Sequence, residues 1–281
     1  MIRSVRLQPD PHIHNPLAPS PAPSRDVFPK EHGAYGQLLF PLLTALAIGR
    51  RTPAALLLAG AAICAFVAHE PLLVLLGQRG PRAAREQRSR AIAWFAVAAV
   101  GAIVLAAGAM IQARDGLALA RSLLVPAAFA MALAAAIALH REHTLAGEIL
   151  AAITFSSIAY PFARAAGAAQ SVAITCAAVF AAVFVTATVC VHAVIARTRR
   201  PPAIGARVAG VFVAVGVLLV LWQLGVRGVV SSLSAAAAFP ACLVAGIAAI
   251  AVRSAKRLRP IGWTLIVTTL MAAALLIVAF G

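Results

Sequence analysis

The sequence predicts an all-α fold, a polytopic transmembrane helical bundle of about nine spans. Hydrophobic residues make up 62% of the 281 residues and charged residues only 11%, and the mean hydropathy is +0.94. Soluble domains carry roughly a quarter charged residues and under half apolar ones. The charged residues here also cluster between long apolar runs. These three observations exclude a soluble globular protein and indicate an integral membrane protein.

The first part of the chain, residues 1–30, differs from all that follows. It holds seven of the 17 prolines among scattered charges. Such a segment cannot bury enough apolar surface to fold, and it lacks the apolar core of a secretory signal peptide. We therefore expect a disordered, Pro-rich cytoplasmic tail over 1–30 and a transmembrane helical domain over 31–281.

Nine apolar runs follow the tail. A helix that spans the hydrocarbon core needs about 20 residues, with a range of about 17–25. Most runs reach that length, and the fifth is the shortest. Their richness in Ala, Gly and Ser lets helices approach closely, as in a compact bundle. The runs cover 33–49, 53–76, 91–111, 122–139, 148–163, 170–194, 208–224, 230–252 and 261–280.

The basic residues predict the orientation. If the N-terminus is cytoplasmic, 18 of the 24 lysines and arginines fall in cytoplasmic segments and 6 in outside loops, as the positive-inside rule requires. We expect a multi-pass cell-membrane protein with a cytoplasmic N-terminus and a periplasmic or extracellular C-terminus. No basic helix carries interleaved aromatic residues, so we expect no nucleic-acid partner. The expected partner is the lipid bilayer itself.

The few acidic and histidine residues mark candidate sites. His69 and Glu70 lie about six residues before the cytoplasmic end of the second run, or about 10 Å inside the membrane at 1.5 Å per residue. A charge there costs about 2.5–3.5 kcal/mol and normally faces a polar cavity or a partner. The alternative is that Glu70 extends toward the loop arginines and has a structural role only.

Other candidates lie at the same side of the membrane. Glu31 and His32 stand at the entry of the first run, where an acid also suits the positive end of a helix dipole. Glu148 opens the fifth run, and His192 lies near the cytoplasmic end of the sixth. A lone membrane histidine is often only hydrogen-bonded to a neighbouring helix. The four cysteines lie inside apolar runs at no metal-binding spacing and are expected to be inert.

Together these residues predict a polar cavity on the cytoplasmic side. We expect a divalent metal such as Mg²⁺ to be held by His69, Glu70, Glu148 and His192, although manganese and zinc suit the same ligands. An anionic headgroup or phosphate would be bound by Glu31, His32, Arg79, Arg82 and Arg141. No catalytic residue can be assigned.

Two segments carry a resemblance to a known family. The stretch Pro29-Lys30-Glu31-His32-Gly33-Ala34-Tyr35-Gly36, followed by Leu38 to Leu43, resembles the opening signature of the YwiC-like family. The segment Arg141 to Glu148 resembles the middle region of that family, which comprises bacterial polytopic membrane proteins without an established activity. The resemblance covers residues 28–281 and implies a bacterial inner-membrane protein. Tyr35 stands where the family pattern has Trp.

A more distant similarity is to the UbiA superfamily of membrane prenyltransferases. Those proteins have nine helices, and aspartate-rich motifs after helices two and six bind magnesium and a prenyl diphosphate. His69 and Glu70 fall where the first motif begins, and His192 falls at the second. Residues 72–75 and 193–202 contain no acid, so two magnesium ions cannot be held in the usual way. The resemblance thus implies a shared bundle with an absent or changed reaction.

The resulting interpretation is a YwiC-like membrane protein that binds a lipid or isoprenoid (diphosphate) headgroup on the cytoplasmic side. Whether it is an enzyme, such as a divergent prenyltransferase-like protein, is left open by the sequence. One alternative is a proton-coupled transporter in which Glu70 and Glu148 take up protons, although transporter sites lie near the midplane. The other is a non-catalytic membrane scaffold.

Overall fold

The computed structural model describes residues 32–199, 204–252 and 258–281, and every regular element in these ranges is a helix. The predicted fold class is confirmed. The predicted tail, 1–30, lies outside the described residues. In chain order the helices are α1 (His32–Ile48), α2 (Pro53–Leu75), α3 (Pro81–Glu86), α4 (Arg88–Gln112), α5 (Gly116–Ala138), α6 (Leu145–Ser157), α7 (Ala159–Ala165), α8 (Gln170–Arg199), α9 (Ile204–Val226), α10 (Ser234–Ala251) and α11 (Leu258–Phe280).

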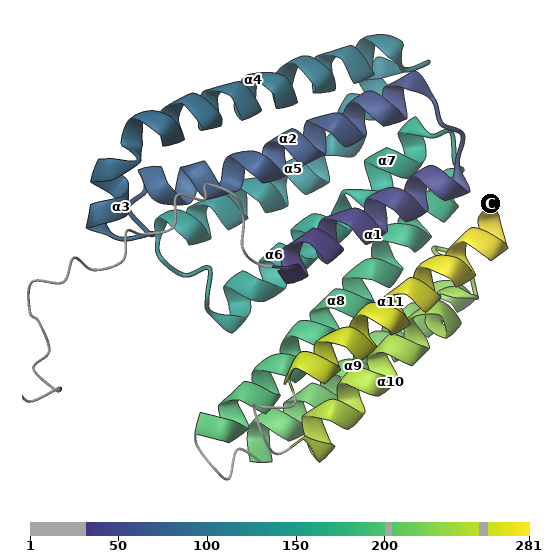
Figure 1. Cartoon of the computed structure of the whole chain (residues 1–281). Helices are drawn as coiled ribbons and strands as arrows, with labels where there is room; N and C mark the ends of the chain where they lie inside the picture. Colours follow the sequence, from purple (N-terminus) through teal and green to yellow (C-terminus); the bar gives the residue numbers. More distant parts are fainter. Residues whose placement is uncertain (1–31, 200–203, 253–257) are drawn as a thin grey trace, which may run out of the picture.

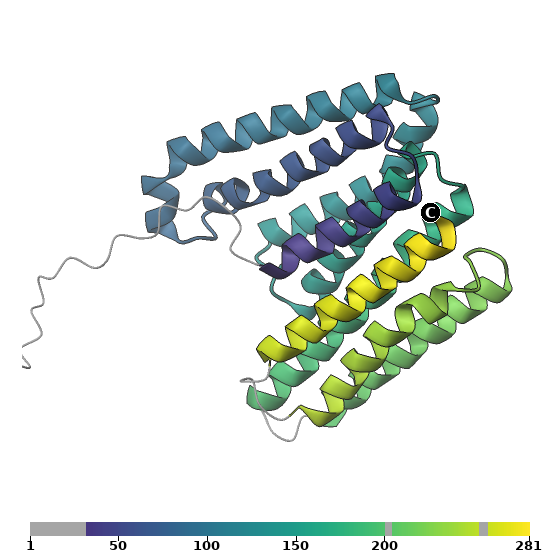
Figure 2. The ribbon, with the colours of Figure 1, turned by 45° about the vertical axis from the view of Figure 1, so that its right-hand side comes forward.

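The long helices run back and forth along one direction, so the bundle has two ends (Figure 1). One is the α3 end, where α2 ends, α4 begins, and α5 connects to α6. At the opposite end lie the α1–α2, α4–α5 and α7–α8 connections and the C-terminus. A view turned by 45° shows the same division (Figure 2). The alternation expected for successive membrane crossings is therefore present.

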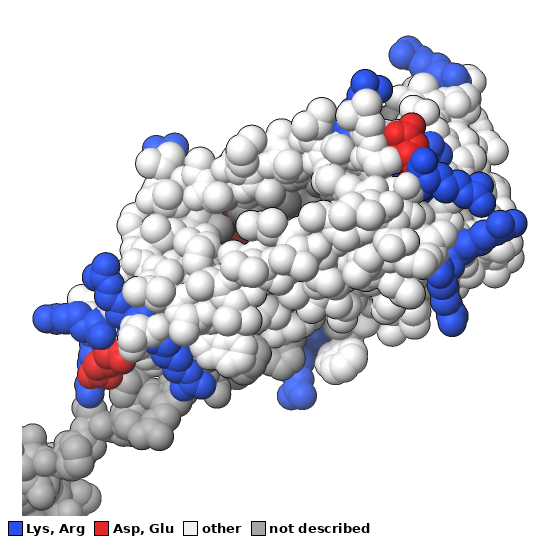
Figure 3. Space-filling model, turned by 90° about the horizontal axis from the view of Figure 1, so that it is seen from above, with Lys and Arg blue, Asp and Glu red and all other residues white. Residues whose placement is uncertain are grey.

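Eight helical stretches of the described chain are long and apolar enough to cross a membrane, with α6 and α7 together forming one of them over Leu145–Ala165. The first predicted span, α1, is apolar but shorter than these. The sequence had suggested instead that the fifth run was the short one. Most of the charged side chains on the face seen in Figure 3 lie toward its two ends, and the surface between them is largely uncharged. This distribution matches a membrane-spanning bundle.

Several helices extend beyond the apolar runs that predicted them. The fourth run was expected to begin at 122, but α5 begins at Gly116, so Arg121 lies inside that helix. Likewise Arg164 lies in the last turn of α7 rather than in a loop. A helix continues past a charged residue because its backbone hydrogen bonds do not depend on hydropathy, and a long arginine can extend its guanidinium toward water. The polar ends of the bundle are consequently more ordered than expected.

The fifth span is broken rather than continuous. Its two helices, α6 and α7, meet at Ile158. Pro161 contributes to the break, because proline has no N–H to donate to the carbonyl of Ser157, four residues earlier, and its ring crowds that carbonyl. The break places Ser157 and Tyr160 at an irregular point in the span.

The core is centred on α8, which packs against α6, α7, α9 and α10. Its fully buried side chains include Val179, Phe180 and Val183, and Phe180 stacks on Phe184. All four cysteines are free and at least partly buried. At the opposite end, Thr52 caps α2 by accepting from the Ala55 N–H, and it donates to the Ala165 carbonyl of α7 at 2.7 Å. These contacts fix the helices that carry the polar residues considered below.

Candidate functional site

The strongest polar contact at the α3 end joins Glu70 of α2 to Arg79 of the following loop. Arg79 donates from Nε to Oε1 at 2.7 Å and from Nη2 to Oε2 at 2.6 Å. The Glu70 side chain is 7% exposed and that of Arg79 36%. Both carboxylate oxygens are thus engaged by one guanidinium, the bidentate geometry that makes such pairs strong. The sequence allowed Glu70 to be either a metal ligand or a partner of a loop arginine. In the structure, Glu70 is the partner of a loop arginine.

The other loop arginines are arranged differently. Arg82 donates to Glu86, four residues along α3, at 2.7 Å, and both side chains are largely exposed. Arg141 is exposed in the α5–α6 connection. Arg82 therefore balances the charge of Glu86, and Arg141 points its charge to the surface of the α3 end.

Glu148 and His192, two of the predicted metal ligands, lie close together. His192 Nδ1 lies 3.4 Å from Glu148 Oε2, with side-chain exposures of 36% and 42%. Glu148 is in the first turn of α6, and His192 is near the α3 end of α8. The packing of α6 on α8 places them together. Both side chains remain accessible, which a ligand-binding pair requires.

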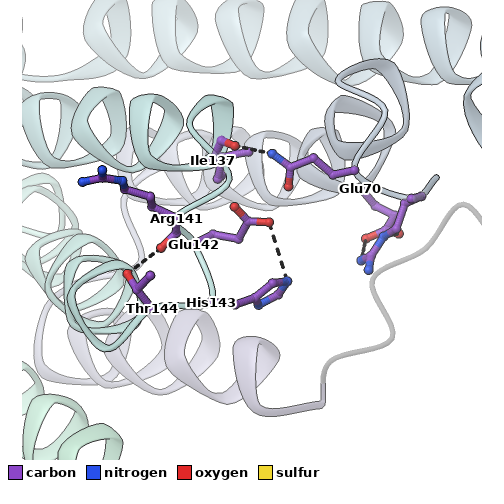
Figure 4. Close-up of polar contacts among 8 residues, drawn as sticks. Glu70, Ile137, Arg141, Glu142, His143 and Thr144 are labelled. Atoms are coloured by element: carbon purple, nitrogen blue, oxygen red, sulfur yellow. Dashed lines mark hydrogen bonds and ion pairs between the residues drawn. The ribbon is translucent and has the colours of Figure 1, made fainter. Parts of the chain in front are cut away.

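The α5–α6 loop, which precedes the helix that carries Glu148, holds a further acid, Glu142 (Figure 4). Thr144 caps α6 by accepting from the Gly147 N–H at 3.2 Å and donates to the Arg141 carbonyl at 2.7 Å. Gly147 is needed there, because a Cβ would overlap the carbonyl oxygens of Arg141 and Glu142. The turn is tight enough to fix the start of α6.

Glu142 turns inward from this loop. Its Oε1 lies 3.6 Å from His143 Nε2, and its Oε2 is buried without a hydrogen bond in the described part of the chain. Nearby, the Gln78 amide donates to the Ile137 carbonyl at the end of α5, while Gln78 Oε1 is also buried without a partner there. Buried acceptors normally have a donor, an ion or water. Two such oxygens mark the interior of the α3 end as a polar region.

The predicted metal ligands do not form one cluster in the described residues. No group of three or more His, Cys, Asp or Glu side chains able to hold a metal occurs in the ranges that the structure describes. Glu148 and His192 form one pair, and Glu70 belongs to the contact with Arg79. His69 is half-buried beside Glu70 and makes contacts of its own. Glu31 lies outside the described residues, and His32 is the first residue of α1.

Sequence reasoning missed a cavity at the opposite end. It has a volume of about 640 Å³ and lies among α5, α6, α7 and α8, with Arg121, Tyr160, Arg164 and Gln170 in its wall. The arginines had been used only to count charges in loops. No sequence signal singled out this cavity, since Pro161, which follows Ser157 by four residues, has a counterpart in Pro126, which follows Ser122 by four residues inside the continuous helix α5.

Residues 28–163 match the family described as YwiC-like protein. Over this segment the chain is YwiC-like. The match contains α1 to α6 and most of α7, and with them Glu70, Arg79, Glu142 and Glu148. It confirms the resemblance first carried by residues 29–43 and 141–148. It covers just under half of the chain and ends before α8, which supplies His192.

No curated protein and no solved structure matched the chain. The family match over residues 28–163 and the apolar helices together support a multi-pass integral membrane protein. The likeness to the UbiA superfamily, and that of residues 164–281 to the YwiC-like family, remain predictions from sequence.

Proposed function

We propose that this YwiC-like protein binds the anionic headgroup of a membrane lipid or isoprenoid diphosphate at the α3 end, on the cytoplasmic side of the membrane. The observation that supports this most directly is the Glu148–His192 pair, 3.4 Å apart and accessible. A carboxylate beside an imidazole is suited to a phosphate bridged by a divalent cation. The α3 end carries Arg79, Arg82 and Arg141.

A metal at this pair would be held by Glu148 Oε2 and His192 Nδ1. Magnesium is commonly bound by one or two carboxylates together with substrate phosphates and water, while manganese and zinc accept imidazole more readily. Two protein donors are therefore enough only if the diphosphate supplies others. When bound, the metal would neutralise phosphate charge. Glu70 is a poorer ligand than Glu148, because Arg79 engages both of its oxygens.

The residues of the site have separate roles in this proposal. Gly147 and Thr144 fix the first turn of α6 and so the direction of Glu148. The Glu70–Arg79 pair holds the α2–α3 connection in place. Arg82 and Arg141, which are exposed, would meet the headgroup. The apolar helices would accept the lipid tail.

The test is native mass spectrometry of detergent-purified protein with geranyl diphosphate, with and without Mg²⁺ or Mn²⁺. Wild-type protein should retain the diphosphate in a metal-dependent manner. Glu148→Gln and His192→Gln should each reduce retention at least tenfold. The matched control is Glu86→Gln, which removes an exposed acid at the same end and should behave like wild type. Equal retention by all four proteins, or none by wild type, would rule out the proposed site.

A second candidate function is proton-coupled transport. It is favoured by the position of the cavity, because α6–α7 and α8 carry Glu148 and His192 at one end and polar cavity residues at the other. The break at Ile158 resembles the broken helices that line transporter sites. Proteoliposomes with a pH-sensitive dye inside would test it under an imposed K⁺ diffusion potential. Proton uptake should exceed that of empty vesicles and fall in Glu148→Gln, and uptake equal to empty vesicles would eliminate this function.

A further inference from the structure

The cavity at the opposite end of the bundle has two chemically different parts. Its wall includes Arg121 and Ser122 of α5, Tyr160 and Arg164 of α7, and Gln170 of α8. Each of these residues lies within about two turns of the opposite end of its helix or helix pair. The remaining wall is largely apolar. The volume of about 640 Å³ falls in the range of about 300–1,000 Å³ that small-molecule sites occupy.

Along α8, and along α6 and α7 together, the polar residues of the cavity wall lie nearer the end of the bundle than the apolar ones. On α8 the wall begins with Gln170 and continues through Ile174 and Ala178 to Ala181, a depth of about 16 Å at 1.5 Å per residue. On α7 and α6 it passes from Arg164 through Tyr160 to Ile153. Both walls thus change from polar at the bundle end to apolar toward the middle. A ligand complementary to them has a polar head and an apolar tail.

The charge at the mouth determines the sign of that head. The opposite end carries six arginines (Arg50, Arg51, Arg114, Arg121, Arg164 and Arg227) and a single acid among the described residues, Asp115. Asp115 already accepts from the Ala118 N–H at 2.9 Å. In addition, among the helices that line the cavity, α5 and α8 begin here with the positive ends of their dipoles, against the single negative end of α7. An anionic head is favoured.

The hydrogen bonds leave the two arginines as the charged donors of the wall, beside the neutral donors of Tyr160 and Gln170. Arg164 donates a hydrogen bond from Nη1 to the Ala168 carbonyl at 2.7 Å. This bond uses one of the five guanidinium N–H groups. The Ser122 and Ser157 hydroxyls donate to carbonyls of their own helices, at 2.6 and 2.8 Å. Their protons are therefore committed, and both arginine side chains are exposed toward solvent.

We propose that this cavity is a second binding site, separate from the α3 end, that takes an anionic amphiphile. Arg121 and Arg164 bind a phosphate or carboxylate head. The apolar tail lies between α5 and α8, against the surface formed by α6 and α7. Helix α6 packs against both α5 and α8 and forms part of that surface. The irregular backbone at Ile158 lies against the cavity, as expected where non-helical backbone is tolerated within a membrane span.

The experiment measures lipid retention by native mass spectrometry in a neutral detergent. The probes are lysophosphatidylglycerol, lysophosphatidylcholine with the same acyl chain, and glycerol phosphate as a head without a tail. Wild-type protein should retain lysophosphatidylglycerol at least tenfold more strongly than lysophosphatidylcholine and should not retain glycerol phosphate. The paired substitution Arg121→Gln and Arg164→Gln should abolish the preference.

Two variants separate this site from general effects of charge or folding. Arg114→Gln with Arg227→Gln removes two arginines from the same end but outside the cavity wall, and should keep the preference. Ala178→Leu narrows the apolar part and should weaken retention of both lysolipids while leaving elution as a folded protein unchanged. Equal retention of the two lysolipids by wild type would overturn the proposal, as would an equal loss in the two arginine pairs. Retention of glycerol phosphate alone would show a simple phosphate site instead. None of these outcomes depends on Glu148 or His192.

Discussion

Arg79→Gln should be far more damaging than its neighbour Arg82→Gln, although both remove one arginine from the same loop region. Arg79 makes two charge-assisted hydrogen bonds, at 2.7 and 2.6 Å, to a carboxylate that is 7% exposed. Removing one partner of a buried ion pair costs about 3–5 kcal/mol, since the other charge is left without compensation. Because Arg79 itself is 36% exposed, the lower end of that range applies, about 3 kcal/mol.

The comparison with Arg82 comes from the structure. Arg82 and Glu86 form an i,i+4 pair with side-chain exposures of 65% and 48%. Such surface helix pairs contribute only about 0.3–0.5 kcal/mol. The two substitutions should therefore differ roughly sixfold or more in their effect on the free energy of unfolding.

Glu70→Gln completes a double-mutant cycle. It leaves a guanidinium that can reach water, so it should cost less than Arg79→Gln. The double variant should be more stable than the sum of the two single losses predicts, with a coupling free energy of about 1–3 kcal/mol. Unfolding in a titration of SDS against a mild detergent, followed by far-UV circular dichroism, measures all four proteins. Equal losses for Arg79→Gln and Arg82→Gln, or a coupling below about 0.5 kcal/mol, would refute the reasoning.

Three further predictions concern the loops and the orientation. Thr52→Ala removes a helix cap and the hydrogen bond to the Ala165 carbonyl, and should lower the free energy of unfolding by about 1–2 kcal/mol in the same titration; no measurable loss would contradict the assigned cap. Gly147→Ala places a Cβ against backbone carbonyls, so it should both destabilise the protein and reduce the metal-dependent retention of geranyl diphosphate; unchanged retention would mean that the turn does not position the site. For orientation, Glu86→Cys should react with a membrane-impermeant thiol reagent only after cells are opened, whereas Arg114→Cys should react in intact cells, and the reverse pattern would invert the topology.

The sequence by itself determined the architecture. Apolar runs of membrane-spanning length specify helices because a bilayer leaves backbone groups no partners outside their own segment. The alternation of these runs with charged loops also gave the two ends of the bundle, since charges avoid the hydrocarbon layer. The family could be recognised because residues 29–36 and 141–148 form local patterns, which need no tertiary contact.

Pairwise contacts needed the tertiary structure. From sequence, Glu70 was expected to be a metal ligand, with a loop arginine as the alternative partner, and only the return of the α2–α3 loop brings Arg79 against both of its oxygens. Glu148 and His192 were expected on one side of the membrane, but their distance of 3.4 Å follows from how α6 packs on α8.

The cavity at the opposite end was decided by tertiary structure alone. Arg121 and Arg164 are ordinary loop charges by hydropathy, because hydropathy records where a residue lies in depth and not which neighbours surround it. Helices α5, α6, α7 and α8 have to pack together before the same arginines line a common space. Helix positions are local properties of the chain, whereas cavities are properties of the gaps between helices, and those gaps depend on the shapes of all the side chains that meet there.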